Sequence, residues 1–295
     1  MTAMHASPPH YHAAIESSLA GRTSWTRLLT YVGILLFTLI VLVPFWWIAN
    51  MSFKTYEQIQ FATSIYFPNP FTWQNYRALL FESPFPYWFR NSFLVSTAVT
   101  ALTLVLGSLG GYTLARLRFP GRKTMASGVL ILYLVPPALL FIPLYRVLSE
   151  LGTINTHWSL ILAYLTFTVP FATWLLIGFF RSIPSELEEA ALIDGASRVQ
   201  AFHRIVLPLA APGIVAAAIF SFTLSWNEFL YALIFIQDEG LMTIPVGLNL
   251  LIYGEVFLWG MLMAASVLTT VPVVILYIFV QRWMVQGLTA GAVKG

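Results

Sequence analysis

The 295-residue chain is 58% hydrophobic and only 9% charged, whereas soluble domains average roughly 25% charged residues, so lipid must surround most of it. Its formal net charge of +3 is too small and too scattered to indicate nucleic-acid binding. The lack of cysteine excludes disulfides, Cys-ligated zinc and a cysteine nucleophile.

Six stretches without Asp, Glu, Lys or Arg each exceed the roughly 20 residues that a helix needs to cross a bilayer. A further apolar piece, 240–254, is too short to span and contains Pro245, so we expect a re-entrant or surface loop there. The fold class is therefore all-α and integral to the membrane, with six transmembrane helices. They are predicted over 28–49, 90–114, 124–146, 158–180, 206–229 and 257–280.

The basic residues predict the orientation, because cytoplasmic segments of membrane proteins carry an excess of Lys and Arg. With the amino terminus inside, eleven basic residues fall on the inner side, and only Lys54, Arg77, Arg90 and Arg146 fall outside. Both termini are therefore expected in the cytoplasm. The first 27 residues lack a cleavage site after a short apolar core, so the first helix is expected to be an uncleaved anchor.

Within the core, the GxxxG of Gly107 and Gly111 predicts a close approach of two helix backbones, and prolines in several helices predict kinks.

The predicted spans and their orientation divide the chain into segments. The segments are a disordered cytoplasmic tail (1–27), the first transmembrane helix (28–49), an external segment (50–87), a core of five helices (88–281) that includes the cytoplasmic loop 181–205, and a cytoplasmic tail (282–295).

The cytoplasmic loop concentrates charge that the rest of the chain avoids. Ser185 and Glu188 have the spacing of a capping box, which predicts a helix from about Glu186. Gly195 is placed to end or bend this helix, and a second helical piece near 197–204 would lead to Pro208. Connections normally need only a few residues, so this length favours a docking element over a plain solvated loop.

Within this loop, "EAALIDGASRVQAFHRIVLP" resembles the EAA signature of the permease subunits of ABC importers: E-A-A, three residues, G, nine residues, I, one residue, L-P. Three further stretches, "NYRALL", "SWNEFLYAL" and "GLTAGAVKG", are similar to the carbohydrate branch of that family, the class of the second maltose-transporter permease. The resemblance covers about residues 25–295. The fixed positions of the signature are filled by Glu189, Ala190, Ala191, Gly195, Ile205, Leu207 and Pro208.

The resemblance implies a type I ABC importer permease fold in the cytoplasmic (inner) membrane, in a multi-pass chain that is not itself an enzyme. It implies that the loop is the coupling helix, which seats on an ATP-binding subunit, and that segment 287–295 also reaches toward the ATPases. The implied partners are a second permease forming a heterodimer, two nucleotide-binding ATPase subunits that use ATP and Mg, and an extracytoplasmic sugar-binding protein. The implied coupling residues are Glu188, Glu189, Ala190, Ala191, Asp194, Gly195, Ile205, Leu207 and Pro208.

Two further sets of residues are candidates for contacts with the substrate and with the binding protein. Trp226, Asn227 and Glu228 end the fifth predicted helix, where an aromatic face beside an amide or carboxylate suits a carbohydrate. The alternative is that Asn227 and Glu228 lie at the outer interface or hydrogen-bond a neighbouring helix. The external loop 237–255 resembles the segment that reaches the sugar-binding protein, with candidate contacts at Asp238, Glu239, Pro245 and Asn249.

The sequence lacks the motifs that several kinds of function require. No GxxxxGK[ST], HExxH or GxSxG motif occurs, and the five histidines are scattered, so the sequence predicts no cofactor or metal bound by this chain and no catalytic site. The leading hypothesis is a permease subunit that moves a carbohydrate, an oligosaccharide by the resemblance, inward by alternating access. The alternatives are an ABC permease for a non-sugar solute, an intramembrane enzyme, and a stand-alone secondary transporter, whose inverted repeats are not visible here.

Overall fold

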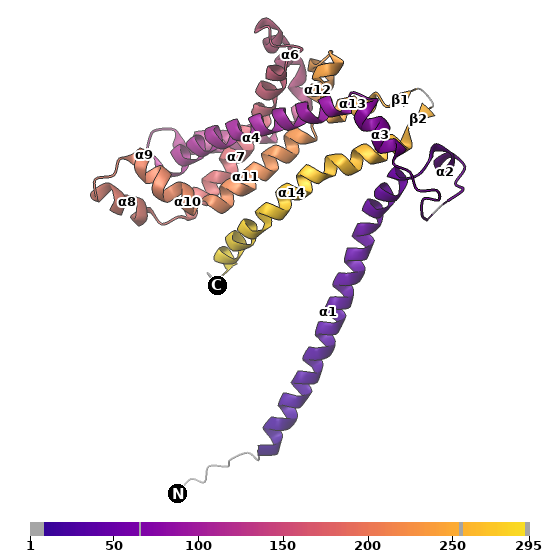
Figure 1. The fold of residues 1–295 in the computed structure, drawn as a ribbon. Coiled ribbons are helices and arrows are strands. Elements are labelled where there is room, and N and C mark those ends of the chain that lie inside the picture. The colour runs from indigo at the N-terminus through magenta and orange to yellow at the C-terminus, as the bar shows by residue number, and fades with distance from the viewer. Residues whose placement is uncertain (1–8, 65, 254–255, 293–295) are drawn as a thin grey trace.

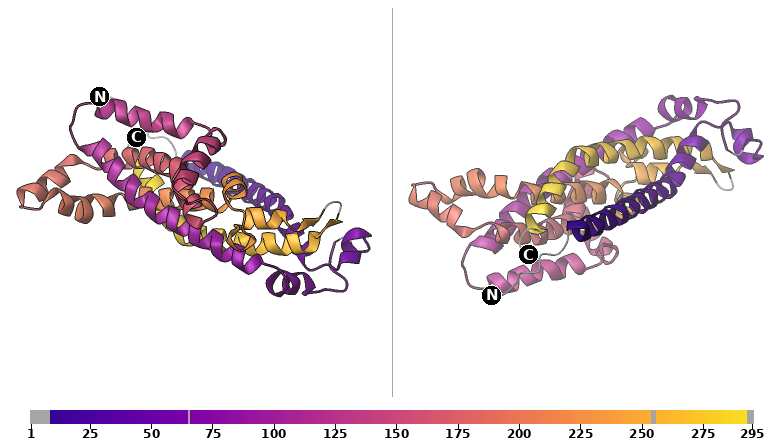
Figure 2. Two further views of the ribbon diagram at one scale, coloured as in Figure 1. Left: turned by 90° about the horizontal axis from the view of Figure 1, so that it is seen from above. Right: turned by 90° about the horizontal axis from the view of Figure 1, so that it is seen from below.

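A computed structural model describes the backbone of residues 9–64, 66–253 and 256–292, and the side chains of residues 25–64, 66–252 and 258–281. Figure 1 shows an elongated helical bundle, and Figure 2 shows that α8 and α9 lie at the end opposite α2 and α3. The elements in chain order are α1 (Pro9–Ser52), α2 (Tyr56–Gln60), α3 (Gln74–Phe81), α4 (Phe85–Arg116), α5 (Arg122–Leu134), η1 (Pro137–Leu139), α6 (Phe141–Glu150), α7 (His157–Ser182), α8 (Ser185–Ile193), α9 (Arg198–Ala201), η2 (Phe202–Val206), α10 (Leu207–Leu209), α11 (Ala211–Trp226), α12 (Leu230–Phe235), η3 (Glu239–Leu241), α13 (Ile244–Asn249), the paired strands β1 (Ile252–Tyr253) and β2 (Val256–Phe257), and α14 (Trp259–Ala292).

The centre of the bundle is the pair formed by α4 and α7. A Cβ built on Gly107 would lie 3.0 Å from the Cβ of Ala172, and one built on Gly111 would lie 3.1 Å from the Cβ of Leu176. Larger residues at these two positions would push the helices apart, so the close approach predicted from the GxxxG spacing is confirmed. A buried hydrogen bond of 2.7 Å between the hydroxyls of Thr103 and Thr168 also joins the two helices.

Apolar side chains form three clusters along this pair. One includes Val95 and Leu160 with residues of α12, and a second gathers Trp88 and Trp226 against α14. The third cluster contains Tyr112, Phe180, Phe202, Val206 and their neighbours, at the end of the bundle that carries α8 and α9. The segment η2, which follows α8 and α9, is therefore packed into the core of the bundle.

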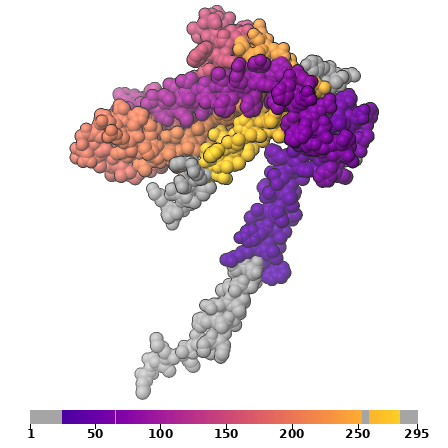
Figure 3. Space-filling view, viewed as in Figure 1, coloured from indigo at the N-terminus to yellow at the C-terminus, as the bar shows by residue number. Residues whose placement is uncertain are grey.

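Four helices are long and apolar enough to cross a membrane. They are the segments Trp25–Ser52, Phe85–Arg116, His157–Ser182 and Trp259–Gln281, and a bent pair of helices gives a fifth candidate. The described part of α1 projects from the body of the molecule and meets α14 near one end (Figures 1 and 3). The count of six spans and the cytoplasmic side of both termini stay predictions.

The prediction of one continuous helix over 124–146 is wrong. The segment divides into α5, the 3-10 turn η1 and α6. Pro136 and Pro137 supply no backbone N–H, and the backbone of Val135, just before them, is extended. The 13 residues of α5 cover only about 20 Å, less than the hydrocarbon thickness.

The predicted helix over 206–229 is also corrected. The chain from Arg198 to Leu209 forms a separate helical arm, bent by 77° from α11, which runs from Ala211 to Trp226. The bend lies at Ala210, between two prolines that cannot donate helical hydrogen bonds, Pro208 and Pro212. The arm, which carries the second half of the signature, therefore turns away from α11.

Three smaller expectations concern segments outside the core. The disordered tail predicted over 1–27 is wrong for residues 9–27, which belong to α1; after Pro9 this stretch contains no proline to interrupt a helix. The external segment contains α2 and α3, and α14 continues through 282–292. The side chains of 282–295 lie outside the described residues, and so does the proposed reach of 287–295.

The apolar piece 240–254 is not a span, as predicted. It folds into η3, α13 and β1, and both η3 and α13 pack on the N-terminal half of α4. Asn91 donates hydrogen bonds to the carbonyls of Gly240 (2.8 Å) and Met242 (3.0 Å), and Trp88 Nε1 donates to the carbonyl of Glu239 (3.1 Å). These bonds fix the external loop to the bundle.

Candidate functional site

The first helix of the loop, α8, begins without the predicted capping box. Pro184 occupies the N-cap position and has no side-chain acceptor, and Ser185 is already the first helical residue. Glu188 cannot complete the box because its carboxylate is engaged elsewhere, as described below. The reciprocal box of this loop lies at α9 instead, where the Ser197 and Gln200 side chains each accept the other's backbone N–H.

Gly195 ends α8, as predicted. Its φ of +87° is a left-handed conformation that strongly favours glycine. The N–H of Ala196 bonds to the carbonyl of Ala191 (2.9 Å), and that of Gly195 bonds to Leu192 (3.2 Å), which is the Schellman pattern. The sharp turn sets α9 immediately against α8.

After α9, the chain enters the bundle through the π-helical turn η2. Phe202 and Val206 are buried in the third apolar cluster, with the ring of Phe202 4.6 Å from that of Tyr112 and 6.2 Å from that of Phe180. These contacts connect the loop to both α4 and α7. A displacement of the loop therefore acts on the central helix pair through packed aromatic rings.

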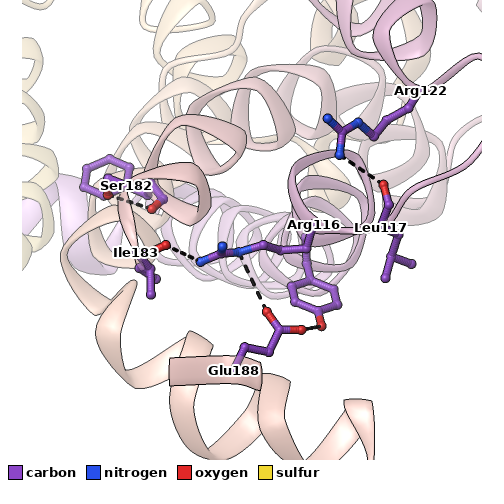
Figure 4. A network of polar contacts seen from close by, with 8 residues as sticks. Arg116, Leu117, Arg122, Ser182, Ile183 and Glu188 are labelled. Carbon is purple, nitrogen blue, oxygen red and sulfur yellow. Dashed lines mark hydrogen bonds and ion pairs between the residues drawn. The ribbon is translucent and has the colours of Figure 1, made fainter. Parts of the chain in front are cut away.

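A polar network also connects α8 to α4 (Figure 4). Glu188 is only 7% exposed; one carboxylate oxygen accepts a hydrogen bond from the Tyr112 hydroxyl, and the other lies 3.8 Å from Arg116 Nε. Arg116 Nη2 donates to the carbonyl of Ile183 at 2.6 Å, in the turn before α8. The carboxylate is thus paired with a cation and a hydroxyl, which is what makes its burial tolerable.

The opposite face of α8 is open. Glu189, Ala190, Asp194 and Gly195 are exposed, and so is Ile193, at 86%. Ile193 lies outside the candidate membrane spans, so its exposed side chain is accessible to a partner. Ala191, Ile205 and Leu207 are half-buried, and Pro208 is exposed.

A groove of about 810 Å³ lies beside this open face. It runs between α8 and the turn after α4, and it brings the carboxylates of Glu188 and Glu189 beside a set of guanidinium groups. Its charged lining residues are Arg116, Arg118, Arg122, Glu188, Glu189 and Arg198. Such a polar groove fits a water-soluble protein surface rather than lipid.

The candidate substrate residues lie at the other end of α11 and do not form one surface. Trp226 is 4% exposed and stacks on Phe222, with ring centroids 5.4 Å apart. Asn227 is exposed, and its side chain donates to the carbonyl of Thr223 at 2.8 Å. Glu228 is half-buried and accepts the N–H groups of Tyr231 and Ala232 (3.0 and 3.2 Å), so it caps α12.

The candidate contacts with the binding protein lie on the external loop. Asp238, Glu239 and Asn249 are exposed, and Asp238 accepts the N–H of Gly240 at 2.8 Å. Pro245 is half-buried in the first turn of α13. Over the described residues, no three His, Asp or Glu side chains are grouped closely enough to hold a metal ion.

The chain matches a protein family over residues 103–290, a range that includes α7, the whole loop and α11. The family is described as the binding-protein-dependent transport system inner membrane component. The chain belongs to this family.

Relatives of this permease match it over nearly its whole length. It is 38% identical to the inner membrane ABC transporter permease protein YcjP of Escherichia coli, over 92% of this chain and 97% of the relative. It is 38% identical to the trehalose/maltose transport system permease protein MalG of Thermococcus litoralis, over 91% and 97%. A bacterial ABC transporter structure involved in alginate import has a TM-score of 0.72 at 20% identity, covering 95% of this chain and 99% of that one, which supports the type I fold.

Family membership confirms several expectations. The permease is a multi-pass protein of the inner membrane, and the ATPase activity of such transporters resides in separate subunits, so the chain itself is not an enzyme. ATP is used by those subunits, and transport depends on a binding protein.

Sequence reasoning missed the roles of Tyr112 and Arg116. The pattern of basic residues predicts for Arg116 only a role in orientation, although Arg116 is the first charged residue after a long apolar run and stands where the predicted span ends. The signature predicts that Glu188 contacts the ATPase, but its side chain faces α4, away from the open face. Adjacent residues of a helix point about 100° apart, so Glu188 and Glu189 cannot both face the same partner. This spacing could have predicted that one of the two carboxylates faces the bundle.

Proposed function

We propose that this permease imports a carbohydrate, and more specifically an oligosaccharide, by ATP-driven alternating access. The observation that carries the proposal is the loop between α7 and α11, which presents an open helical face and is tied to α4 on its other side. The carbohydrate is supported by the relative named for trehalose and maltose transport.

The proposed coupling residues divide into two groups. Glu189, Ala190, Asp194 and Gly195 form the face that seats on an ATPase subunit, together with Ile193, which fills an apolar depression on the partner. Glu188, Ala191, Ile205 and Leu207 lie on the side of the bundle and hold the loop in place, and Pro208 sets the bend before α11. Closure of the ATPase pair would move α8 as a rigid body, and Arg116 and Phe202 would pass this motion to α4 and α7.

The proposed assembly contains a second, similar permease, two ATPase subunits that use ATP and Mg, and an extracytoplasmic sugar-binding protein. The exposed Asp238, Glu239 and Asn249, with Pro245 ordering α13, form the surface proposed for the binding protein. The external loop suits this role because its hydrogen bonds to Asn91 and Trp88 hold it on α4, so docking there can reach the central helix pair.

Reconstituted vesicles test the proposed function. We expect uptake of labelled oligosaccharides only when the assembled transporter, its binding protein and internal ATP are all present. Competition with amino acids and peptides checks the non-sugar alternative, and uptake of one of these in place of every sugar would overturn the carbohydrate assignment. Ion-driven sugar uptake by this chain without an ATPase would establish the stand-alone transporter instead.

Replacing Asn227 with alanine tests the substrate path. If its exposed amide contacts the sugar, losing one hydrogen bond should raise the KM for uptake about three- to tenfold with little change in the maximal rate. The matched control is Gln60→Ala, another exposed amide that lies on α2, away from the proposed contact surfaces. An unchanged KM for Asn227→Ala would assign the residue to helix capping alone.

A further inference from the structure

A second groove, which shares Arg122 with the one beside α8, lies between α5 and α7. Its volume is about 860 Å³, within the range of small-molecule sites. The cations Arg122 and Lys123 enter it from the first turn of α5, and Arg181 enters it from the last turn of α7. None of its described lining residues is acidic.

The groove changes from cationic to apolar along its length. Away from the three cations it is lined by Leu130, Trp174 and other apolar side chains of the two helices, and Trp174 is 43% exposed. The hydroxyl of Ser127 and that of Ser182 lie among the lining residues near the charged end. A ligand that fits this lining has an anionic head and a hydrocarbon tail.

The cations of this groove are available for a ligand. Over the described residues, the ion pairs are Arg116–Glu188 and Arg146–Glu150, and neither involves Lys123 or Arg181. Arg122 donates to the carbonyl of Leu117 at 3.2 Å, which holds its guanidinium at the groove without neutralising it. The groove beside α8 differs, because it carries two glutamates among its arginines.

We infer that the groove between α5 and α7 binds an anionic phospholipid. The phosphate would lie between Lys123 and Arg181, and an acyl chain would run along Leu130 and Trp174. The charged end is on the same side as α8, so the lipid belongs to the cytoplasmic leaflet, whose anionic lipids attract basic groups. A bound lipid would fill the space beside α7, the helix that leads directly into the coupling loop.

Lipid retention tests this site. The transporter, purified through a tag on this chain in mixed micelles of phosphatidylcholine and phosphatidylglycerol, is examined by native mass spectrometry. We expect phosphatidylglycerol to be retained in preference to phosphatidylcholine, and the double variant Lys123→Gln/Arg181→Gln to lower this preference by roughly tenfold. Arg146→Gln, an exposed change in the middle of α6, should leave it unchanged.

Two further arms identify the occupant. A phosphatidylglycerol with a photoreactive acyl chain should label the α5 and α7 peptides around Leu130 and Trp174, and the charge-preserving variant Lys123→Arg/Arg181→Lys should keep this labelling. Equal retention of phosphatidylglycerol in the Gln double variant would overturn the proposal. Displacement by excess inorganic phosphate would show a soluble-anion site, and cross-linking of the groove to a second permease would show a protein interface; either result contradicts a lipid site.

Discussion

Replacing Glu188 with lysine is expected to abolish sugar uptake while leaving the transporter assembled. The substitution places a cation beside Arg116 and removes the acceptor of the Tyr112 hydroxyl. Breaking a buried pair in this way costs about 3 kcal/mol, or about a hundredfold in the equilibrium between an attached and a detached loop. Because the open face of α8 is untouched, the ATPase should still bind and hydrolyse ATP without driving transport. ATP hydrolysis and uptake are measured on the same vesicles.

The control for this prediction is Glu186→Lys, the same change of charge at an exposed position of α8. It should reduce uptake by less than about twofold. Glu188→Gln, which keeps an acceptor for Tyr112 but loses the charge, should fall between the two. Coupled transport by the Glu188→Lys variant at the normal rate would show that the network of Tyr112, Arg116 and Glu188 is not needed for coupling. Other contacts would then transmit the motion of α8 to α4.

Replacing Glu189 with lysine is expected to release the ATPase subunits. Glu189 is exposed on the face proposed to meet them, and reversing a charge in an interface costs about 2–3 kcal/mol, or roughly 30- to 100-fold in affinity. Gly195→Pro should add to the loss, because proline cannot adopt a φ of +87°. The measurement is the amount of ATPase that copurifies with the tagged permease.

The control for the docking prediction lies on the opposite side of the membrane. Glu239→Lys makes the same reversal at an exposed residue of the external loop and should leave copurification of the ATPase unchanged. Its effect is expected on the binding protein instead. If Glu189→Lys and Gly195→Pro both retained the ATPase and transported sugar normally, the open face of α8 would not be the docking surface.

Much of the fold could be predicted because hydrocarbon requires long apolar runs. The helices α4 and α7 and the contact at Gly107 and Gly111 follow from residue composition and spacing alone. The breaks could not be placed in the same way. Pro170 and Pro272 remain inside continuous helices, whereas the Pro136–Pro137 pair ends α5, so a span accommodates one proline and two adjacent prolines interrupt it.

In the candidate site, too, some features could be predicted from the sequence and others could not. The helix, the glycine turn and the second helical piece were predicted from local signals that act within a few residues. The network of Tyr112, Arg116 and Glu188 was missed because its members are about 70 positions apart in the chain and meet only after α4 packs on α7. The Ser185 and Glu188 spacing also predicted a capping box that does not form, because the Glu188 carboxylate contacts Tyr112 and Arg116 instead.

The central claim is that the open face of α8 meets an ATPase subunit. The chain contains no cysteine, so Ile193→Cys gives it a single thiol at a highly exposed point of that face. A photoreactive maleimide attached there is expected to cross-link the ATPase in the assembled transporter, in a yield that changes when ATP binds, whereas the same probe at Asn249→Cys should not. Cross-links from position 193 to lipid or to the second permease, with none to the ATPase, would contradict the account.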